Sequence, residues 1–298
     1  MTVWGLRATM GGDAEAEASF RLTRPPVGRP ATALVFASPH SGRIYPAGLM
    51  EASRLDKDAI RRSEDAWVDR LIAAAPDHGA PVLSARLARA WLDLNRDPWE
   101  LDPAMFEDEL PAYARGRSAR VAAGLGCIAR TVGDGEEIYR RKLTFAEALA
   151  RVETVHRPYH AALKGLVESA RRESGAAVLI DWHSMPSAAT RQGGAGAGCD
   201  VVLGDRFGSA CAPAVSRLVE TTLQALGYRV ARNAPYAGGY TTEHYGRPAG
   251  RVHALQVEIN RAIYMDEATL TPLPGFDALR RDLETLFARL AATDWSGL

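Results

Sequence analysis

The sequence predicts an α/β fold, a three-layer α/β/α sandwich. Short apolar runs alternate along the chain with longer segments of helical periodicity, which is the pattern of an α/β domain. Two of the apolar runs end on polar residues, PHSG at residues 39–42 and DWHS at residues 181–184. Ligands of open α/β sheets bind outside the carboxyl ends of the strands. Both motifs therefore mark candidate sites.

The individual elements follow from the length and spacing of apolar residues. Short apolar runs indicate buried strands, whereas apolar residues three or four positions apart indicate one buried face of a helix. Strands are predicted at residues 31–38, 81–85, 90–94, 176–184, 200–203, 228–231 and 253–259. Helices are predicted at residues 57–76, 144–174, 212–226 and 279–292.

Three segments lack such periodicity and are predicted to be loops. Glycines interrupt residues 98–137, and so long an irregular segment is usually a functional loop, a lid or a mobile stretch. Residues 192–198 are rich in glycine but lack the lysine of a phosphate-binding loop. Residues 236–245 combine glycines with aromatic residues.

The chain is predicted to form a single domain over residues 31–298, because no internal repeat and no linker divides it. Residues 1–30 are of mixed composition and then rich in proline and arginine. We expect them to be an N-terminal extension or an edge element.

Charge and cysteine content narrow the class of protein. The chain of 298 residues carries 36 Lys and Arg against 36 Asp and Glu, so neither nucleic acid nor an anionic membrane is an expected partner. This balance is compatible with a local basic pocket for a small acidic molecule. Three cysteines without C-x-x-C spacing indicate a reducing compartment, and no apolar run reaches the roughly 20 residues of a membrane span. We expect a cytoplasmic protein.

His40 and His183 lie at two predicted strand ends and are candidate metal ligands. Hydrolytic zinc sites use three protein ligands, and two His with one carboxylate are a common set. One strand-end His is more often a hydrogen-bonded structural residue, but two in the same context make a metal site an equal alternative. Asp181 lies on the same side of its strand as His183 and can orient that imidazole.

Glu258 lies inside an apolar predicted strand, LQVEI. An ionised carboxylate is costly to bury unless it is paired or close to a cation. Two interpretations are therefore open: an ion pair with Arg261 or Arg89, or a general base that moves a proton from water to a leaving amine.

Arg89, Asn95 and Arg96 flank the predicted strand at residues 90–94 and are candidate substrate ligands. A guanidinium group can hold a carboxylate bidentately, and an amide can add a hydrogen bond. The alternative for such an arginine is a surface ion pair.

His156 and His160 have the i, i+4 spacing that can chelate a metal from one helix face. They lack the glutamate of an HExxH motif, and they flank Pro158. We therefore favour packing at a helix start over metal binding.

Five motifs follow in order along the chain: PHSG, DAWVDRL, LARAWLDLNR, IDWHSMPS and GGYTTEHYGRPAGRVHALQVEINRAIYMDE. Together they resemble the N-formylglutamate amidohydrolase family. The resemblance extends over about residues 35–267, and its last block, residues 238–267, is long and specific. The family is similar in plan to the zinc carboxypeptidases and to the aspartoacylase and succinylglutamate desuccinylase group.

The resemblance implies a mixed-sheet α/β/α fold that is phosphorylase/hydrolase-like, of the zinc carboxypeptidase type. It also implies one zinc ion (Zn2+) per chain and hydrolysis of an N-acyl amino acid. The family's founding activity converts N-formyl-L-glutamate to formate and L-glutamate, a step of histidine degradation.

The resemblance further implies a role for each matching residue. His40 and His183 are implied metal ligands, with Asp65 as the carboxylate ligand and Glu64 as its alternative. Glu258 is implied as the general base. A second set is implied to bind substrate, and it consists of Arg89, Asn95, Arg96, His244 and Arg247.

The chain departs from the family at Tyr240 in GGYTT, where family members often carry His. This departure bears on the acyl group or the amino acid and leaves the metal set unchanged. One alternative function is therefore a related zinc hydrolase, either a carboxypeptidase-like peptidase or another N-acyl amino acid deacylase. A second is a non-catalytic module that binds an amino acid.

Overall fold

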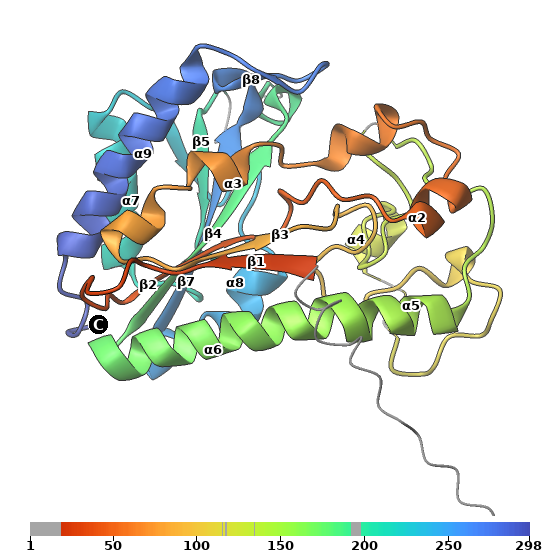
Figure 1. The fold of residues 1–298 in the computed structure, drawn as a ribbon, viewed down its shortest axis with the longest axis horizontal. Coiled ribbons are helices and arrows are strands. Elements are labelled where there is room, and N and C mark those ends of the chain that lie inside the picture. The colour runs from red at the N-terminus through yellow and green to blue at the C-terminus, as the bar shows by residue number, and fades with distance from the viewer. Residues whose placement is uncertain (1–18, 115, 117, 134, 192–197) are drawn as a thin grey trace, which may run out of the picture.

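A seven-stranded mixed sheet runs through the centre of the fold, in the order β1-β3-β2-β4-β7-β5-β6 (Figure 1). The computed structural model describes residues 19–114, 116, 118–133, 135–191 and 198–298. The strands of this sheet are β1 (Phe20–Thr23), β2 (Leu34–Ser38), β3 (Val82–Ala85), β4 (Ala177–Met185), β5 (Val201–Gly204), β6 (Val230–Arg232) and β7 (Val252–Asn260). A separate ladder pairs β8 (Met265–Asp266) with β9 (Thr271–Pro272).

The central strands β3, β2, β4 and β7 are parallel, whereas β1 is antiparallel to β3 and β5 is antiparallel to β7. All four parallel strands therefore end at the same edge of the sheet. The register of β4 and β7 sets His183 beside Glu258 and Asp181 beside Gln256. Two candidate residues that are far apart in the sequence are thus neighbours in the sheet.

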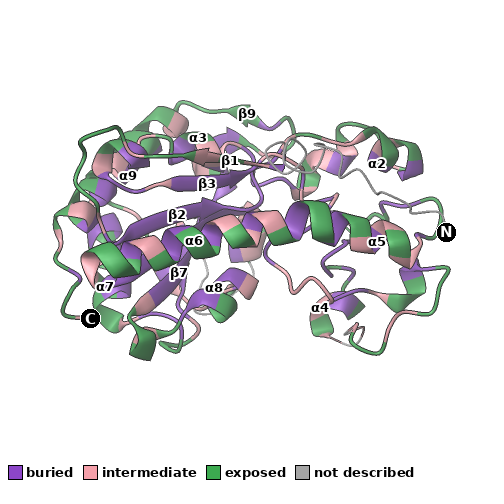
Figure 2. Ribbon diagram, turned by 60° about the horizontal axis from the view of Figure 1, so that its bottom comes forward, coloured by how far each residue is buried: buried purple, intermediate pink, exposed green. Residues whose placement is uncertain are grey.

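Helices cover both faces of the sheet and complete three layers (Figures 1 and 2). One face packs against α3 (Val68–Leu71), α7 (Pro213–Ala225) and α9 (Gly275–Ala292). The other packs against α6 (Arg157–Ser174), while α5 (Phe145–Arg151) precedes α6 in the chain and adds Ala148 to the same core cluster. The remaining α-helices are α2 (Ala47–Ala52), α4 (Ala119–Ala122) and α8 (Tyr240–Tyr245). The short turns are η1 (Ala59–Ser63), η2 (Ala75–His78), η3 (Pro103–Met105), η4 (Val152–His156), η5 (Ser187–Thr190), η6 (Pro248–Gly250) and η7 (Arg261–Ile263).

Strand β2 shows why these runs are apolar throughout. Leu34 and Phe36 belong to the core cluster on the α9 side, and Val35 and Ala37 belong to the cluster on the α6 side. A strand covered on both faces needs an apolar residue at every position. The predicted α/β fold with helices on both faces of a mixed sheet is confirmed.

Six of the predicted strands are confirmed to within a few residues, as β2 to β7, and so are the helices at residues 212–226 and 279–292. The helix predicted at residues 144–174 is interrupted by one π-helical segment, η4. Residues 236–245, predicted as loop, contain helix α8.

The single helix predicted at residues 57–76 is wrong. The segment consists of η1, α3 and η2, with an extended stretch after Ser63. Trp67 has a φ of 68°, in the left-handed region that interrupts a helix. The apolar spacing is real, because Ile60, Val68 and Leu71 are all buried, but separate turns supply those side chains.

The strand predicted at residues 90–94 is also wrong. This segment is a turn whose apolar residues, such as Leu92 and Leu94, are buried on the α6 side of the sheet. The backbone N–H of Asp93 donates to the carbonyl of Cys127 at 2.7 Å instead of joining the sheet. An apolar run buried by a loop has the same pattern as a short strand.

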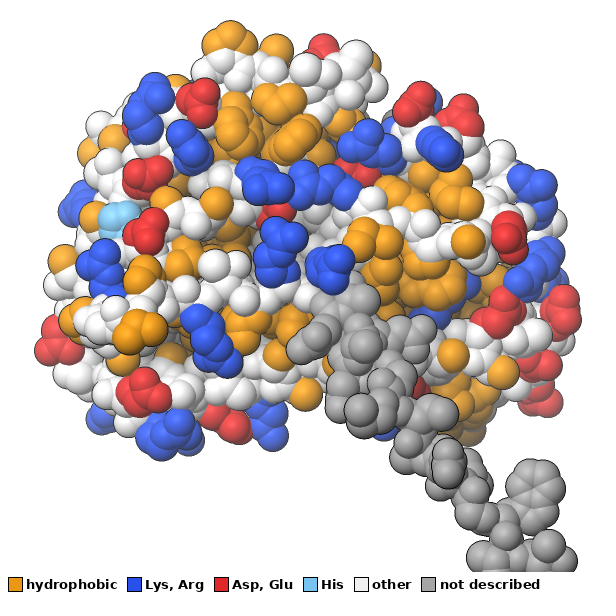
Figure 3. All heavy atoms as spheres, viewed as in Figure 1, with side chains coloured by type: hydrophobic (Ala, Val, Ile, Leu, Met, Phe, Trp, Pro, Cys, Tyr) orange, Lys and Arg blue, Asp and Glu red, His pale blue; other side chains and the backbone are white. Residues whose placement is uncertain are grey.

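Residues 98–137 contain only two short helical elements in their described part, η3 and α4, so their irregularity is confirmed. Residues 1–18 and most of the glycine-rich tract at 192–198 lie outside the described residues. Phe20–Thr23 form β1 at the edge of the sheet. Charges of both signs are interspersed over the face shown in Figure 3, in keeping with the zero net charge.

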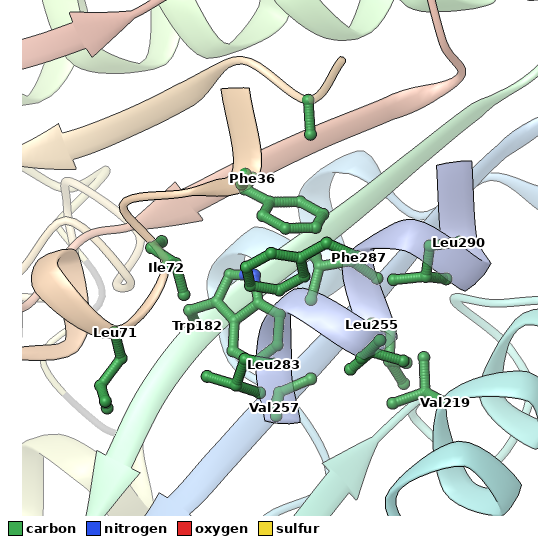
Figure 4. Close-up of a cluster of buried hydrophobic side chains, with 14 of the residues drawn as sticks. Phe36, Leu71, Ile72, Trp182, Val219, Leu255, Val257, Leu283, Phe287 and Leu290 are labelled. Carbon is green, nitrogen blue, oxygen red and sulfur yellow. The ribbon is translucent and has the colours of Figure 1, made fainter. Parts of the chain in front are cut away.

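The core on the α9 side is built around three aromatic rings, of Phe36, Trp182 and Phe287 (Figure 4). Their centroids lie 5.1 to 5.7 Å apart in tilted and edge-to-face arrangements. Trp182 comes from the strand that also carries Asp181 and His183. Packing of this tryptophan therefore fixes the backbone from which both polar side chains project on the opposite face.

Replacing Phe287 by Ala is expected to lower the free energy of unfolding by about 3–5 kcal/mol, because the change leaves a cavity beside Phe36 and Trp182. Chemical denaturation measures the loss. Phe207→Ala is the control, since its ring is 81% exposed and its removal should change stability by less than about 0.5 kcal/mol. Equal effects of the two substitutions would contradict this account of the core.

Candidate metal centre and active site

Polar side chains gather where the parallel strands end. His40 follows β2, Asn95 lies in the segment after β3, His183 is on β4 and Glu258 is on β7. All four line one cavity of about 690 Å³. This volume is in the range of small-molecule sites.

His40, Asp65 and His183 form a buried group of three potential metal ligands. The two imidazoles face each other through their Nδ1 atoms at 3.1 Å. Asp65 Oδ2 lies 3.0 Å from Nδ1 of His183 and 3.4 Å from Nδ1 of His40. Two nitrogens and one carboxylate oxygen thus converge on one point.

Each imidazole turns its other nitrogen, Nε2, toward a buried carboxylate. His40 Nε2 lies 2.6 Å from Asp93, and His183 Nε2 lies 2.9 Å from Asp181. A carboxylate beside Nε2 favours the proton on that nitrogen and leaves a lone pair on Nδ1. Three electron-rich atoms then meet in a buried site, where they repel one another unless a proton or a cation lies between them. The donor set, two imidazole nitrogens and one carboxylate oxygen, fits a divalent metal ion.

The broken helix brings Asp65 into this group. After η1 the chain is extended, and the N–H of Asp65 donates to the carbonyl of His40 at 3.0 Å. Glu64 points elsewhere, because its carboxylate accepts from the hydroxyl of Tyr45 at 2.6 Å and from Arg61 at 2.9 Å. The structure therefore brings Asp65, and not the alternative Glu64, to the two imidazoles.

The charges of this site are strongly coupled. Burial raises the pKa of the Asp65 carboxyl, but the neighbouring imidazoles of His183 and His40 outweigh it and hold that pKa well below its usual range. Burial opposes the charged form of His183, yet the carboxylates of Asp181 and Asp65 hold its pKa well above the ordinary value.

Glu258 borders the group from the neighbouring strand, since it pairs with His183 in the β4–β7 register. Burial raises the pKa of its carboxyl to about 7, against the opposing effect of His183. Gln256 donates to Glu258 Oε1 at 2.7 Å. The alternative prediction, an ion pair with Arg261 or Arg89, is not what the structure shows, because those arginines bind other carboxylates. A carboxylate poised near neutral pH suits proton transfer.

Arg89 and Asn95 are tied to the metal group. Arg89 donates to Asp93 at 2.6 Å and lies 4.0 Å from Asp65. Asn95 Nδ2 lies 3.1 Å from Nε2 of His183, and Asn95 Oδ1 accepts from the N–H of Thr241 at 2.7 Å. Both side chains line the cavity while they position residues around the metal group.

Arg96 binds backbone carbonyls through part of its guanidinium group. Its Nε donates to Leu125 and its Nη1 to Asn95, both at 2.9 Å. Burial is the main reason that its pKa is lowered, and the positive charges of Arg89 and Arg120 act in the same direction. Arg96 also lines the cavity, so its remaining donor can face a ligand.

The sequence indicated no role for Asp93 or Gln256, and for Arg261 it indicated only an ion pair with Glu258, as one alternative. Asp93 binds the outer nitrogen of His40, and Gln256 links Glu258 to Asn95 and to the N–H of Gly239. Arg261 donates to Asp65 at 3.0 Å rather than to Glu258. Asp93 and Arg261 stand inside the DLNR and EINR motifs, and position in a motif was the only signal for them. Gln256 could have been found from its spacing, two residues before Glu258 on one strand face.

His244 and Arg247 do not reach the cavity, so their predicted contact with substrate is not supported. His244 lies on α8 and stacks on Tyr240, with ring centroids 4.9 Å apart. Arg247 donates to the carbonyls of Glu243 and Gly246. Neither residue is among those that line the cavity around the metal group. His244 lies in the segment that was expected to be a loop and is helical, whereas Arg247 follows α8 and forms a bridge with Val252.

Fold and site together define an α/β protein with a buried His–Asp–His group at the carboxyl ends of parallel strands. Among the described residues, no helix is long and apolar enough to span a membrane.

The chain belongs to the N-formylglutamate amidohydrolase family, whose sequence model matches residues 32–265. The N-formylglutamate deformylase of Pseudomonas putida is 32% identical over 241 residues, which cover 78% of this chain and 82% of that protein. The enzyme of the same name from Pseudomonas aeruginosa matches to the same extent. The crystal structure of N-formylglutamate amidohydrolase from Ralstonia eutropha JMP134 gives a TM-score of 0.88 at 39% identity, covering 94% of this chain and 100% of that one. The resemblance seen in the motifs is confirmed.

Zinc binding is expected to depend on the three converging side chains. Metal-stripped protein should bind one zinc ion per chain, and His183→Ala or Asp65→Ala should weaken binding by more than about 100-fold, because each removes one of three ligands. Isothermal titration calorimetry measures the affinity. His244→Ala, an exposed histidine outside the cavity, should bind zinc as the unmodified protein does. Unchanged affinity in the Asp65 and His183 variants would rule out this ligand set.

Proposed function

We propose that this protein hydrolyses the amide bond of N-formyl-L-glutamate, releasing formate and L-glutamate, with one zinc ion held by His40, Asp65 and His183. The observation that carries the proposal is the convergence of two imidazole nitrogens and a carboxylate oxygen beside Glu258. Family membership and the names of the Pseudomonas and Ralstonia relatives support the substrate.

A zinc ion bound at this group would supply a Lewis acid that polarises an amide carbonyl and makes water easier to deprotonate. His40 and His183 present their Nδ1 atoms, while Asp93 is hydrogen-bonded to the outer nitrogen of His40 and Asp181 lies 2.9 Å from that of His183. Arg261 and Arg89 offset the negative charge of Asp65 and Asp93. These contacts keep the three donors fixed before any ligand arrives.

Glu258 carries the proton in this proposal. Its Oε1 is held by Gln256, which leaves Oε2 to take a proton from water and to deliver it to the departing amine nitrogen. Protonated and ionised forms are close in energy, since burial raises the pKa of this carboxyl to about 7. One residue can therefore act first as a base and then as an acid near neutral pH.

Arginines in the cavity would bind the carboxylates of the substrate. Arg89 and Arg261 are paired with Asp93 and Asp65, so their charges are already compensated. Arg96 keeps a free donor, and the guanidinium of Arg120 on α4 pairs with none of the other described residues. Both line the cavity, and their charges are close enough to act on each other. We assign the side-chain carboxylate of the substrate to Arg96 and Arg120, with Arg89 nearer the metal group.

Glu258→Gln is expected to lower kcat for formate release by about 10²–10⁴-fold while zinc stays bound. In the unmodified protein kcat/KM should fall as the pH drops below about 7, because the base must be ionised. A cation beside Glu258 favours its carboxylate, so the midpoint should lie at or below that pH. Steady-state kinetics over pH 4.5–8.5 provide the test. Near-normal turnover by zinc-loaded Glu258→Gln protein would remove Glu258 from this role.

Arg120→Gln is expected to raise KM for N-formyl-L-glutamate and to lower kcat/KM by about 10–100-fold, the effect of losing one charge-assisted contact. N-formyl-L-glutamine, whose side chain is neutral, should lose far less, so the preference for glutamate over glutamine should collapse. Arg120→Lys keeps the charge and should retain part of the preference. If Arg120→Gln discriminates between the two substrates as before, another residue binds the side-chain carboxylate.

A further inference from the structure

His156 and His160 hold the segment that carries Asn95 and Arg96. His160 Nε2 donates to the carbonyl of Leu94 at 2.9 Å, and His156 Nε2 donates to the carbonyl of Arg96 at 3.0 Å. The carbonyl between them, of Asn95, accepts from the N–H of Tyr240 at 3.3 Å. Three successive carbonyls of a segment that forms no strand are thus fixed by partners from outside the segment.

The π-helical segment places both histidines on the same side. Residues Val152–His156 form η4, a wider turn between α5 and α6 that ends at His156. The rings of His156 and His160 lie 4.3 Å apart and tilted by 35°, so both edges reach the neighbouring backbone. Single π-helical turns inside α-helices are rare and are frequent at functional sites.

The environment keeps both imidazoles neutral and defines their tautomers. Burial lowers the pKa of His156 and of His160, in each case against the effect of the carbonyl contact. Because a carbonyl only accepts hydrogen bonds, Nε2 carries the proton in both rings. His160 Nδ1 lies 3.0 Å from the hydroxyl of Tyr245. The Nε2 atoms are therefore bound to the backbone and are not free to bind a metal.

The segment Leu94–Arg96 reaches the metal group through the side chain of Asn95. Asn95 Nδ2 donates to Gln256 Oε1 at 3.4 Å and packs against the ring of His183, 3.1 Å from Nε2. Gln256 in turn donates to Glu258. A carbon atom added to Gly239 would collide with the Asn95 amide, so this amide fits closely against the start of α8. A small shift of the Leu94–Arg96 backbone would move Asn95 away from His183 and Gln256.

We propose that His156 and His160 are positioning residues for the hydrolytic site. They fix the backbone of residues 94–96, and through it they align Asn95 with His183 and Gln256 and direct Arg96 into the cavity. The inference rests on the proposed function, because it assigns a role in that same reaction. It adds two residues that neither belong to the metal group nor line the cavity.

Substitution by Leu and by Gln separates positioning from simple packing. Leu removes the donor, whereas the amide nitrogen of Gln reaches about the position of imidazole Nε2 and can still donate to the carbonyl. His156→Leu and His160→Leu should lower kcat/KM for N-formyl-L-glutamate by about 10-fold or more and weaken zinc binding several-fold. The Gln variants should stay within about threefold of the unmodified protein in both measurements.

Two further variants keep the test interpretable. Leu163→Ala creates a cavity on the same helix, in the core on the α6 side, and should lower stability while leaving kcat/KM and zinc affinity unchanged at a temperature where it is folded. If a Leu variant does not fold, His→Asn replaces it, since the shorter amide cannot reach the carbonyl.

The two measurements also separate this inference from the proposed function. Leu variants with normal kcat/KM and normal zinc affinity would overturn the positioning role, and so would Gln variants as impaired as the Leu variants. If the unmodified protein released no formate, the proposed function would fail. Zinc affinity alone would then decide. Weaker zinc binding by the Leu variants, with normal binding by the Gln variants, would support the positioning role. Equal zinc affinity in all variants would refute it.

Discussion

The approach of two imidazole nitrogens and a carboxylate oxygen within 3.0 to 3.4 Å, in a buried site, is the interaction on which the rest of the structure depends. Such a group is stable only with positive charge between its members. The parallel strands bring His40 and His183 together, and the extended stretch after η1 adds Asp65. The outer carboxylates, Asp93 and Asp181, direct the lone pairs inward.

Arginines surround this group and compensate the charge of its carboxylates. Arg261 and Arg89 contact Asp65 and Asp93 from the side facing the cavity, so the carboxylates that serve the imidazoles are not left unpaired. Among the described residues, Glu258 joins none of these pairs and accepts a hydrogen bond from the neutral amide of Gln256, and burial raises the pKa of its carboxyl to about 7. A network of this kind is costly to assemble without metal, because burying ionised groups opposes folding. Metal binding would therefore stabilise the fold as well as complete the site.

The sequence predicted the strands well because burial on both faces makes each of them a continuous apolar run, as in β2 and β4. It failed at residues 57–76 and 90–94, where buried apolar residues lie on turns and loops that show the spacing of helices and strands. Those failures coincide with the site, since the two segments carry Asp65 and Asp93. Functional loops combine buried apolar residues with polar side chains that face a ligand. The spacing of their apolar residues therefore predicts a helix or strand where none is present.

Site residues at strand ends could be predicted from their motifs. Contacts between segments that are distant in the sequence could not. His40, His183 and Asp65 do converge, and Glu258 borders them, as the motifs indicated. The partners of Asn95 could not be inferred, because they come from β4, α8 and β7, which only the tertiary fold brings together. His244 and Arg247 share a motif with Glu258 but lie on α8 and just after it, and neither lines the cavity.

The central claim is that a metal ion at His40, Asp65 and His183 is required to hydrolyse N-formyl-L-glutamate. Zinc titration of metal-stripped protein, followed by the rate of formate release, tests it most directly. We predict no turnover in the stripped protein and a rate that rises linearly until one zinc ion per chain has been added. Full formate release by protein shown to be free of metal would contradict the claim.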